Sequence, residues 1–302
     1  MEKPTHAYDL GFGPRPDQLL RNPTLRPSAT LNNPMRAGFV GDFGPNIRPE
    51  QWPRGKNSGL PMMHAITVWV PDEYRKQGNH YVAVSFFQGE GQFSEPEKGI
   101  REIFAGQPLT SEQATDPFLK QLTVSAAHEH PMLWRLQDII DGEFGLIWLT
   151  DEEFRGPRTA PPPDPRRAGE HEPVDGDISA WDNTGQPDTF VWISPREGDL
   201  NVGVAPQEFA AYDPAGQRGR FASNGYRVVQ WDEDAPGEDG AWARRLNEHE
   251  GRSHFGGTSF HQQGVPEGLG PYYLELYEFG GLKFGGGGVA QIDLETAVFD
   301  WA

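Results

Sequence analysis

The chain of 302 residues contains no cysteine. Disulfide bridges, zinc–thiolate sites and cysteine nucleophiles are therefore excluded, and a cytoplasmic location is the simplest expectation. No window approaches 18 consecutive apolar residues, so the sequence predicts no membrane-spanning helix. The amino terminus also lacks the apolar stretch that is typical of a secretory signal.

Basic residues are scarce. Lys and Arg together number 26 against 44 Asp and Glu, which gives a formal net charge of −18. A surface of this sign repels nucleic-acid phosphates and anionic lipids, and it attracts cationic partners. We therefore expect a cationic protein partner and no nucleic-acid or membrane partner.

Glycine (37) and proline (28) are abundant, which indicates many turns and short elements and excludes a helical bundle. Alternating apolar residues predict several strands, and the helices that the sequence predicts are short. One such helix begins at Pro131 and ends at Gly142, with Leu133, Leu136, Ile139 and Ile140 on its apolar face. The predicted fold is α+β with mainly antiparallel sheets and short helices.

The chain divides by composition. Residues 1–35 are expected to form an extended amino-terminal arm, and residues 36–154 a first lobe. A Pro- and acid-rich linker or insertion covers 155–188, and a second lobe covers 189–302. Both lobes contain a glycine-rich turn followed by paired strands, so two related lobes with a sheet in each, arising by internal duplication, are one interpretation. Chance similarity among glycine-rich turns is the other.

Five segments resemble motifs of one family in order and spacing: Trp52-Pro53, Leu60-Pro61-Met62, Val84-Ser85-Phe86-Phe87, His254 to Gln262, and Phe284 to Val289. This pattern is similar to that of the YwqG-like family of poorly characterised bacterial proteins. The sequence departs from it at Ser259, where proline is usual, and at Gly286, where aspartate is usual. The resemblance implies an α+β fold with internal duplication and no established catalytic chemistry. Because members often occur in toxin–immunity gene neighbourhoods, it also implies inhibitory binding.

An acidic segment follows a predicted strand near residue 231 and contains Asp232, Glu233, Asp234, Glu238 and Asp239. Pro236 and Gly237 interrupt it, so we expect an exposed loop. The loop either aids solubility or attracts the cationic partner, since such charges chiefly raise association rates.

A second candidate surface surrounds the Gly256-Gly257 turn, where glycine permits positive φ or close approach of another segment. In the strand 272–279, Leu274 and Leu276 are expected to face the core, with Tyr273, Glu275, Tyr277 and Phe279 on the other face. Either this face is simply covered and His254 holds the turn by a backbone hydrogen bond, or the two halves form a small polar cleft. The candidate cleft residues are His254, His261, Gln262, Tyr273, Glu275 and Tyr277.

Two further patterns are weaker. The run Gly285–Gly288 could cradle a phosphate, but a strand follows it and Lys283 precedes it, which favours a hairpin turn. His128-Glu129-His130 lacks a third ligand at a convincing spacing for a metal. We therefore predict no metal, no cofactor and no catalytic residue.

The most direct interpretation is a cytoplasmic, non-enzymatic binding protein, an immunity-type inhibitor of a basic toxin domain. One alternative is an enzyme or binding module that acts on a carbohydrate or another small polar ligand, with the Tyr/Glu strand face as its site. Another is a scaffold that self-assembles through its amino-terminal arm.

Overall fold

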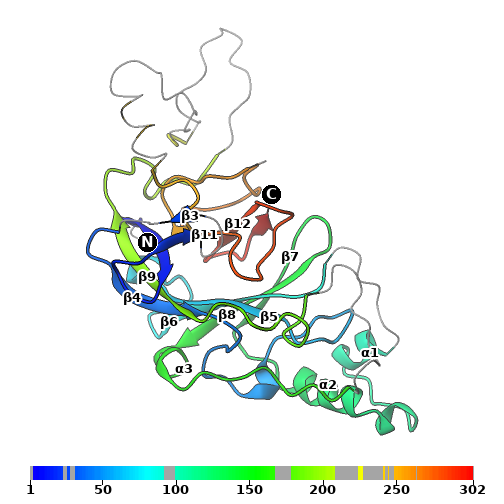
Figure 1. Ribbon diagram of the computed structural model, residues 1–302. Coiled ribbons are helices and arrows are strands. Elements are labelled where there is room, and N and C mark those ends of the chain that lie inside the picture. Colours follow the sequence, from blue (N-terminus) through cyan, green and yellow to red (C-terminus); the bar gives the residue numbers. More distant parts are fainter. Residues whose placement is uncertain are drawn as a thin grey trace.

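The computed structural model describes residues 3–22, 26–27, 31–91, 99–166, 178–207, 224–226, 241, 244, 248–262 and 264–301. It consists mainly of one antiparallel sheet with a few short helices (Figure 1), which confirms the predicted α+β class with mainly antiparallel strands. The strands are β1 (Ala7–Gly13), β2 (Leu20–Asn22), β3 (Arg26–Pro27), β4 (Met35–Val40), β5 (Met63–Trp69), β6 (Tyr81–Gln88), β7 (Leu133–Gln137), β8 (Glu143–Thr150), β9 (Thr189–Arg196), β10 (His254–Phe255), β11 (Tyr273–Tyr277), β12 (Val289–Asp293) and β13 (Phe299–Trp301).

The strand order is β13-β12-β11-β10-β1-β9-β4-β5-β6-β8-β7, with β2 and β3 attached beside β1. Strands from the predicted first lobe occupy one end of this order, and those from the predicted second lobe occupy the other. They meet where β4 pairs with β9. The two halves therefore share one continuous sheet and do not form a sheet each.

The amino-terminal segment, predicted as an arm, contributes β1 to the middle of the sheet, between β9 and β10. Leu10 and Phe12 are completely buried in the main core. The physical reason is a short alternation in which Tyr8, Leu10 and Phe12 point inward, a pattern hidden among the prolines and glycines that follow. This strand is part of the core and not a peripheral arm.

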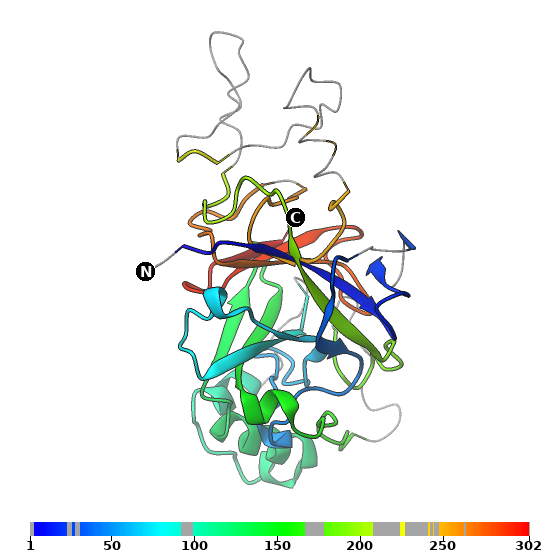
Figure 2. The same cartoon turned by 90° about the vertical axis from the view of Figure 1, so that its left-hand side faces the viewer.

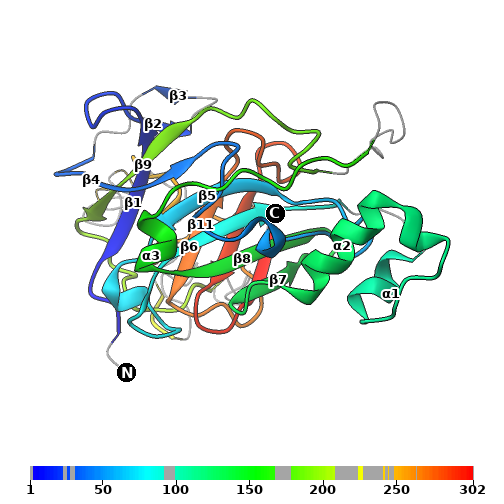
Figure 3. The same ribbon diagram turned by 90° about the horizontal axis from the view of Figure 1, so that it is seen from below.

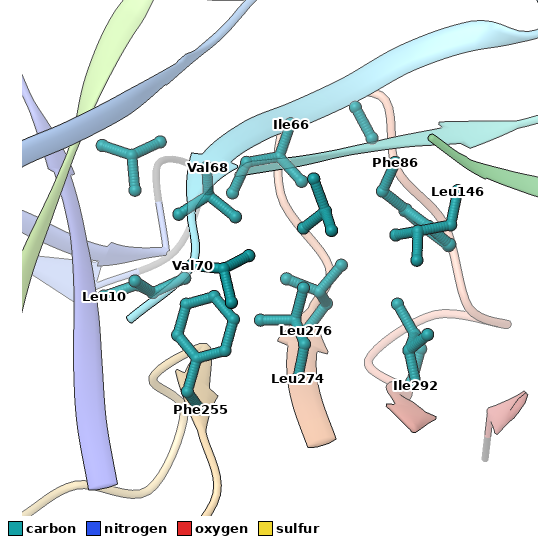
Figure 4. Close-up of a cluster of buried hydrophobic side chains, with 14 of the residues drawn as sticks. Leu10, Ile66, Val68, Val70, Phe86, Leu146, Phe255, Leu274, Leu276 and Ile292 are labelled. Carbon is teal, nitrogen blue, oxygen red and sulfur yellow. The ribbon is translucent and has the colours of Figure 1, made fainter. Parts of the chain in front are cut away.

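The sheet folds over itself, so that two of its layers enclose the core (Figure 2). Ile66, Phe86 and Leu146 on one layer face Leu276 and Ile292 on the other (Figure 4). The two ends of the strand order approach each other. The indole N–H of Trp301, in β13, donates to Asp138, which directly follows β7. The ring of Phe299, also in β13, lies 4.8 Å from that of Phe144 in β8. The sheet is therefore nearly closed.

The helices α1 (Ile100–Phe104) and α2 (Pro117–Ala127) lie together at one end of the sheet, and α3 (Asp151–Arg155) follows β8 directly (Figure 3). Short 3-10 turns occur at Pro49–Gln51, Asp72–Tyr74 and Gln113–Thr115. On the outer face of β6 and β8, a second apolar cluster includes Trp52, Met62 and Ala180. Ala180 belongs to the predicted linker, so the described part of 155–188 that contains it packs against the first half.

The helix predicted after Pro131 is wrong. Residues 133–137 form β7, which pairs with β8 so that Leu133 lies opposite Ile147. The hairpin turn between these strands is held by the Asp138 carboxylate, which accepts the N–H of Ile140 and of Gly142. Gly142 therefore belongs to a β-turn and is not a helix end. As a result Ile139 is 83% exposed, although the sequence placed it on an apolar helix face.

Candidate functional site

A row of polar side chains crosses the outer face of five neighbouring strands, with one side chain each from β9, β1, β10, β11 and β12. Register pairs connect Ser194 to Asp9, Asp9 to His254, His254 to Glu275 and Glu275 to Gln291. All five are at most 2% exposed. The inward face of the same strands is apolar, so the strands follow ordinary two-residue periodicity. The polar row is unusual because it is buried.

Asp9 is the centre of this row. Its Oδ1 accepts from Arg196 Nε at 2.7 Å, while its Oδ2 accepts from Arg252 Nη1 at 2.9 Å and from His249 Nδ1 at 2.5 Å. Burial alone raises the pKa of this carboxyl, but the attraction of Arg196, His249 and Arg252 outweighs it and holds the pKa well below its ordinary value. Asp9 is therefore a buried, ionised carboxylate.

Arg196 also binds a second carboxylate, since its Nη1 donates to Asp199 Oδ2 at 3.0 Å. Asp199 in turn accepts from the backbone N–H of Thr258 at 2.8 Å and of Asn201 at 2.9 Å. Two guanidinium groups and two carboxylates thus balance one another inside the protein, as buried charges must. His249 is the remaining ionisable partner of the group.

A cavity of about 80 Å³ opens beside Asp9, at the end of β9. This volume holds several water molecules or one small polar group. Arg252 is 6% exposed, and its Nε has no hydrogen-bond partner among the described residues. His249 uses Nδ1 for Asp9, which leaves Nε2 as the nitrogen that can bind another molecule. The cavity is lined by Asp9, Leu31, Asn32, Ser194, Pro195, Arg196, Glu197, His249 and Arg252.

The other end of the row is fully packed. Glu275 accepts from Ser259 Oγ at 2.7 Å, from the Phe260 N–H at 3.0 Å and from Gln291 Nε2 at 3.2 Å. His254 lies beside it, with Nδ1 3.6 Å from Glu275 Oε1. Burial, together with the positive charge of Arg196, lowers the pKa of His254, which favours the neutral ring. Its Nδ1–H is 3.0 Å from the carbonyl oxygen of Arg252, so His254 holds the backbone next to the cavity.

The structure brings four of the six predicted cleft residues together on one sheet face: His254, Tyr273, Glu275 and Tyr277. They are buried by the turn at 257–260, because Tyr273 Oη donates to the Gly257 carbonyl at 3.0 Å and Tyr277 Oη lies 3.4 Å from the Phe260 carbonyl. They therefore do not form an exposed platform for a sugar. His261 is partly exposed and Gln262 exposed, at the edge of this cluster.

Phe279, expected on the same face, instead packs in the main core, 4.9 Å from the ring of Phe12. The strand ends at Tyr277, so the alternation does not extend to residue 279. The two turn glycines do adopt positive φ, +55° at Gly256 and +79° at Gly257. A Cβ at Gly257 would lie 2.5 Å from Asp199 Oδ2, so close approach also requires glycine there.

The Gly285–Gly288 run is a turn whose amides already bind an anion. The carboxylate of Glu278 accepts the N–H of Phe284, of Gly286 at 2.9 Å and of Gly287 at 2.8 Å. These donors are therefore occupied by a side chain of the chain itself.

The two histidines of His128-Glu129-His130 have different partners. His128 Nδ1 lies 2.8 Å from the Val124 carbonyl oxygen, and His130 Nε2 lies 3.0 Å from Glu153 Oε1. Across the described part of the chain, no group of three or more acidic or histidine side chains is arranged to hold a metal ion.

The acidic segment with Asp232, Glu233, Asp234, Glu238 and Asp239 lies outside the described residues. Sequence reasoning did not find the residues around the cavity. The available signal was Asp9, a charged residue between the apolar Tyr8 and Leu10 of a short strand. Nothing local in the sequence connects it to Arg196 or Arg252.

Among the described residues no helix is both long and apolar enough to cross a membrane. The resemblance to the YwqG-like family stays a prediction. No family model, curated protein or solved structure matches this chain.

Proposed function

We propose that this chain is a non-enzymatic binding protein for a small polar ligand, which enters the cavity beside Asp9. One observation carries the proposal: an open cavity lies directly against a buried cluster of charged groups, and both Arg252 and the ring of His249 line it. A polar ligand in the cavity would bind to groups that these charges already hold in place.

The hydroxyl of Ser194 beside the cavity supports binding over nucleophilic catalysis. Ser194 lies opposite Asp9 and lines the cavity, but its Oγ donates to the Asn32 carbonyl. An activated serine instead donates its proton to a neighbouring base. Ser194 is therefore held as a structural hydroxyl.

The test is an NMR titration of the full chain with acetate, inorganic phosphate, glycerol and glucose, each as a separate probe. We expect at least one probe to shift the backbone amides of Glu197 and Arg252 with saturation. The exposed Asn32, which lines the cavity, is changed to Trp to block it. The matched control is Gln107→Trp, at an exposed position in the helical part of the chain.

Saturation that persists in Asn32→Trp, or no saturable shift with any probe, would contradict the proposal. Binding of a cationic protein, such as a basic toxin domain, remains a second proposal, supported by the net charge of −18. The cysteine-free composition supports placing either activity in the cytoplasm.

A further inference from the structure

We propose that the ligand presents a carboxylate, which binds between Arg252 and the Nε2 of His249. This inference rests on the proposed function, because it names the chemical group that the cavity accepts. The two side chains line the same cavity and share one partner, since both donate to Asp9 Oδ2. They are thus held side by side by a buried anion.

Arg252 supplies the first contact. Its Nη1 donates to Asp9, and this hydrogen bond holds the guanidinium group beside the cavity that the side chain lines. A guanidinium is a planar, permanently charged donor that matches the geometry of a carboxylate. The side chain is 7% exposed, so an anion in the cavity would meet it with little competing water.

His249 supplies the second contact. The hydrogen bond of Nδ1 to Asp9 orients the ring and provides a counter-ion for its protonated form. Nε2–H of that form can then donate to the second carboxylate oxygen. The His249 side chain is 20% exposed, so the ring borders both the cavity and solvent.

The charge balance favours a monoanion. Arg196 and Arg252 are matched by Asp9 and Asp199. A protonated His249 therefore leaves one positive charge, which a carboxylate neutralises. Glu197, an exposed residue that also lines the cavity, would repel a second negative charge such as that of a phosphate dianion.

The experiment compares acetate with acetamide, its neutral isostere, and with inorganic phosphate, by NMR titration of the full chain. We expect acetate to bind about tenfold or more tightly than acetamide, which corresponds to about 1.4 kcal/mol, and more tightly than phosphate.

Two variants locate the contacts. Arg252→Lys keeps the charge but removes the planar guanidinium group, and should weaken acetate binding about tenfold; Arg155→Lys, at a side chain 67% exposed, is its control. His249→Gln should weaken acetate binding about tenfold, whereas His128→Gln, at an exposed site, should leave it unchanged. Both variants are first checked for a native amide spectrum.

The outcomes separate the two proposals. Equal affinity for acetate and acetamide, or undiminished acetate binding in a folded Arg252→Lys, would overturn the carboxylate assignment and leave a polar-ligand site intact. Saturable binding of glucose or glycerol alone would do the same. Failure of every probe to bind would overturn the proposed function itself.

Discussion

At the scale of single residues, Asp9 neutralises two buried guanidinium groups and holds His249. We expect Asp9→Asn to lower the free energy of unfolding by about 3–5 kcal/mol, because the amide leaves Arg196 and Arg252 without their shared charge. Urea unfolding measures this difference. Asp17→Asn, at an exposed aspartate, should change stability by less than about 0.5 kcal/mol, and an equal effect of both variants would contradict the assigned role.

Gly256 illustrates a backbone constraint. Its φ is +55°, and a Cβ there would lie 2.1 Å from the hydroxyl of Tyr74. That hydroxyl cannot easily move, because it donates to the His6 carbonyl at 2.7 Å and the tyrosine is fully buried. Gly256→Ala should therefore destabilise the protein by more than about 1 kcal/mol.

Gly106 is the matched control, because its φ is +76° and a Cβ there would meet no atom within 4 Å. Gly106→Ala carries the cost of a left-handed backbone alone. Thermal melts of the two variants should differ, with the lower Tm for Gly256→Ala. Identical melts would show that the contact with Tyr74 is relieved by small shifts.

At the scale of elements, β1 decides whether strands β10 to β13 stay attached to the rest of the sheet. Its ladder joins β9 on one side to β10 on the other. Deleting residues 1–13 should therefore abolish the cooperative thermal transition, and the point variant Leu10→Ala should cost about 2–5 kcal/mol. If the truncated chain melts at the same temperature as the full chain, β1 is not part of the core in solution.

The β7–β8 hairpin gives a second comparison. Leu136 is 4% exposed and belongs to the main core, whereas Ile139 at the turn is 83% exposed. We expect Leu136→Ala to cost about 2–5 kcal/mol and Ile139→Ser less than about 0.5 kcal/mol. The helix that the sequence predicted would bury both residues on one face, so similar losses in urea unfolding would favour that helix.

At the scale of the whole molecule, several acidic side chains accept hydrogen bonds from backbone N–H groups in turns and loops. Asp293 accepts three backbone N–H groups, from Gly270, Glu295 and Thr296. Asp42, Glu90, Glu275 and Glu278 each accept backbone N–H groups in the same way. A chain with 65 glycines and prolines has many irregular segments, and these carboxylates satisfy their amides.

Acid should therefore unfold the protein. Although partial burial raises the pKa of Glu153, its hydrogen bonds with His130 and Thr150 lower it to about 2 from an ordinary 4.5. The pKa of Asp9 is shifted in the same direction. A carboxyl whose pKa is lower in the folded chain contributes stability above its ordinary pKa, and that stability is lost as pH falls toward the folded value.

The free energy of unfolding should accordingly decrease as pH falls below about 4.5. Glu153→Gln should reduce the slope of this decrease, because one of the protonating groups is gone. Urea unfolding at a series of pH values measures the slope. An unchanged slope would contradict the assigned role, because it would mean that folding does not change the pKa of Glu153.

The sequence by itself determined the antiparallel α+β class, because side chains that alternate along strands such as β5 and β6 record which face is buried. It also located the turn at Gly256-Gly257, where positive φ and close approach both require a residue without Cβ. These features depend on residues close together in the chain.

Tertiary structure alone decided the cavity. Asp9 meets Arg196 and Arg252 only because β1 lies between β9 and β10, an order that no local pattern encodes. Tertiary structure also decided that residues 133–137 form a strand. Their leucines fit a helix or a strand, and pairing with β8 selects the strand. Strand order is set by which layers can bury their apolar faces against each other, and that depends on the whole chain at once.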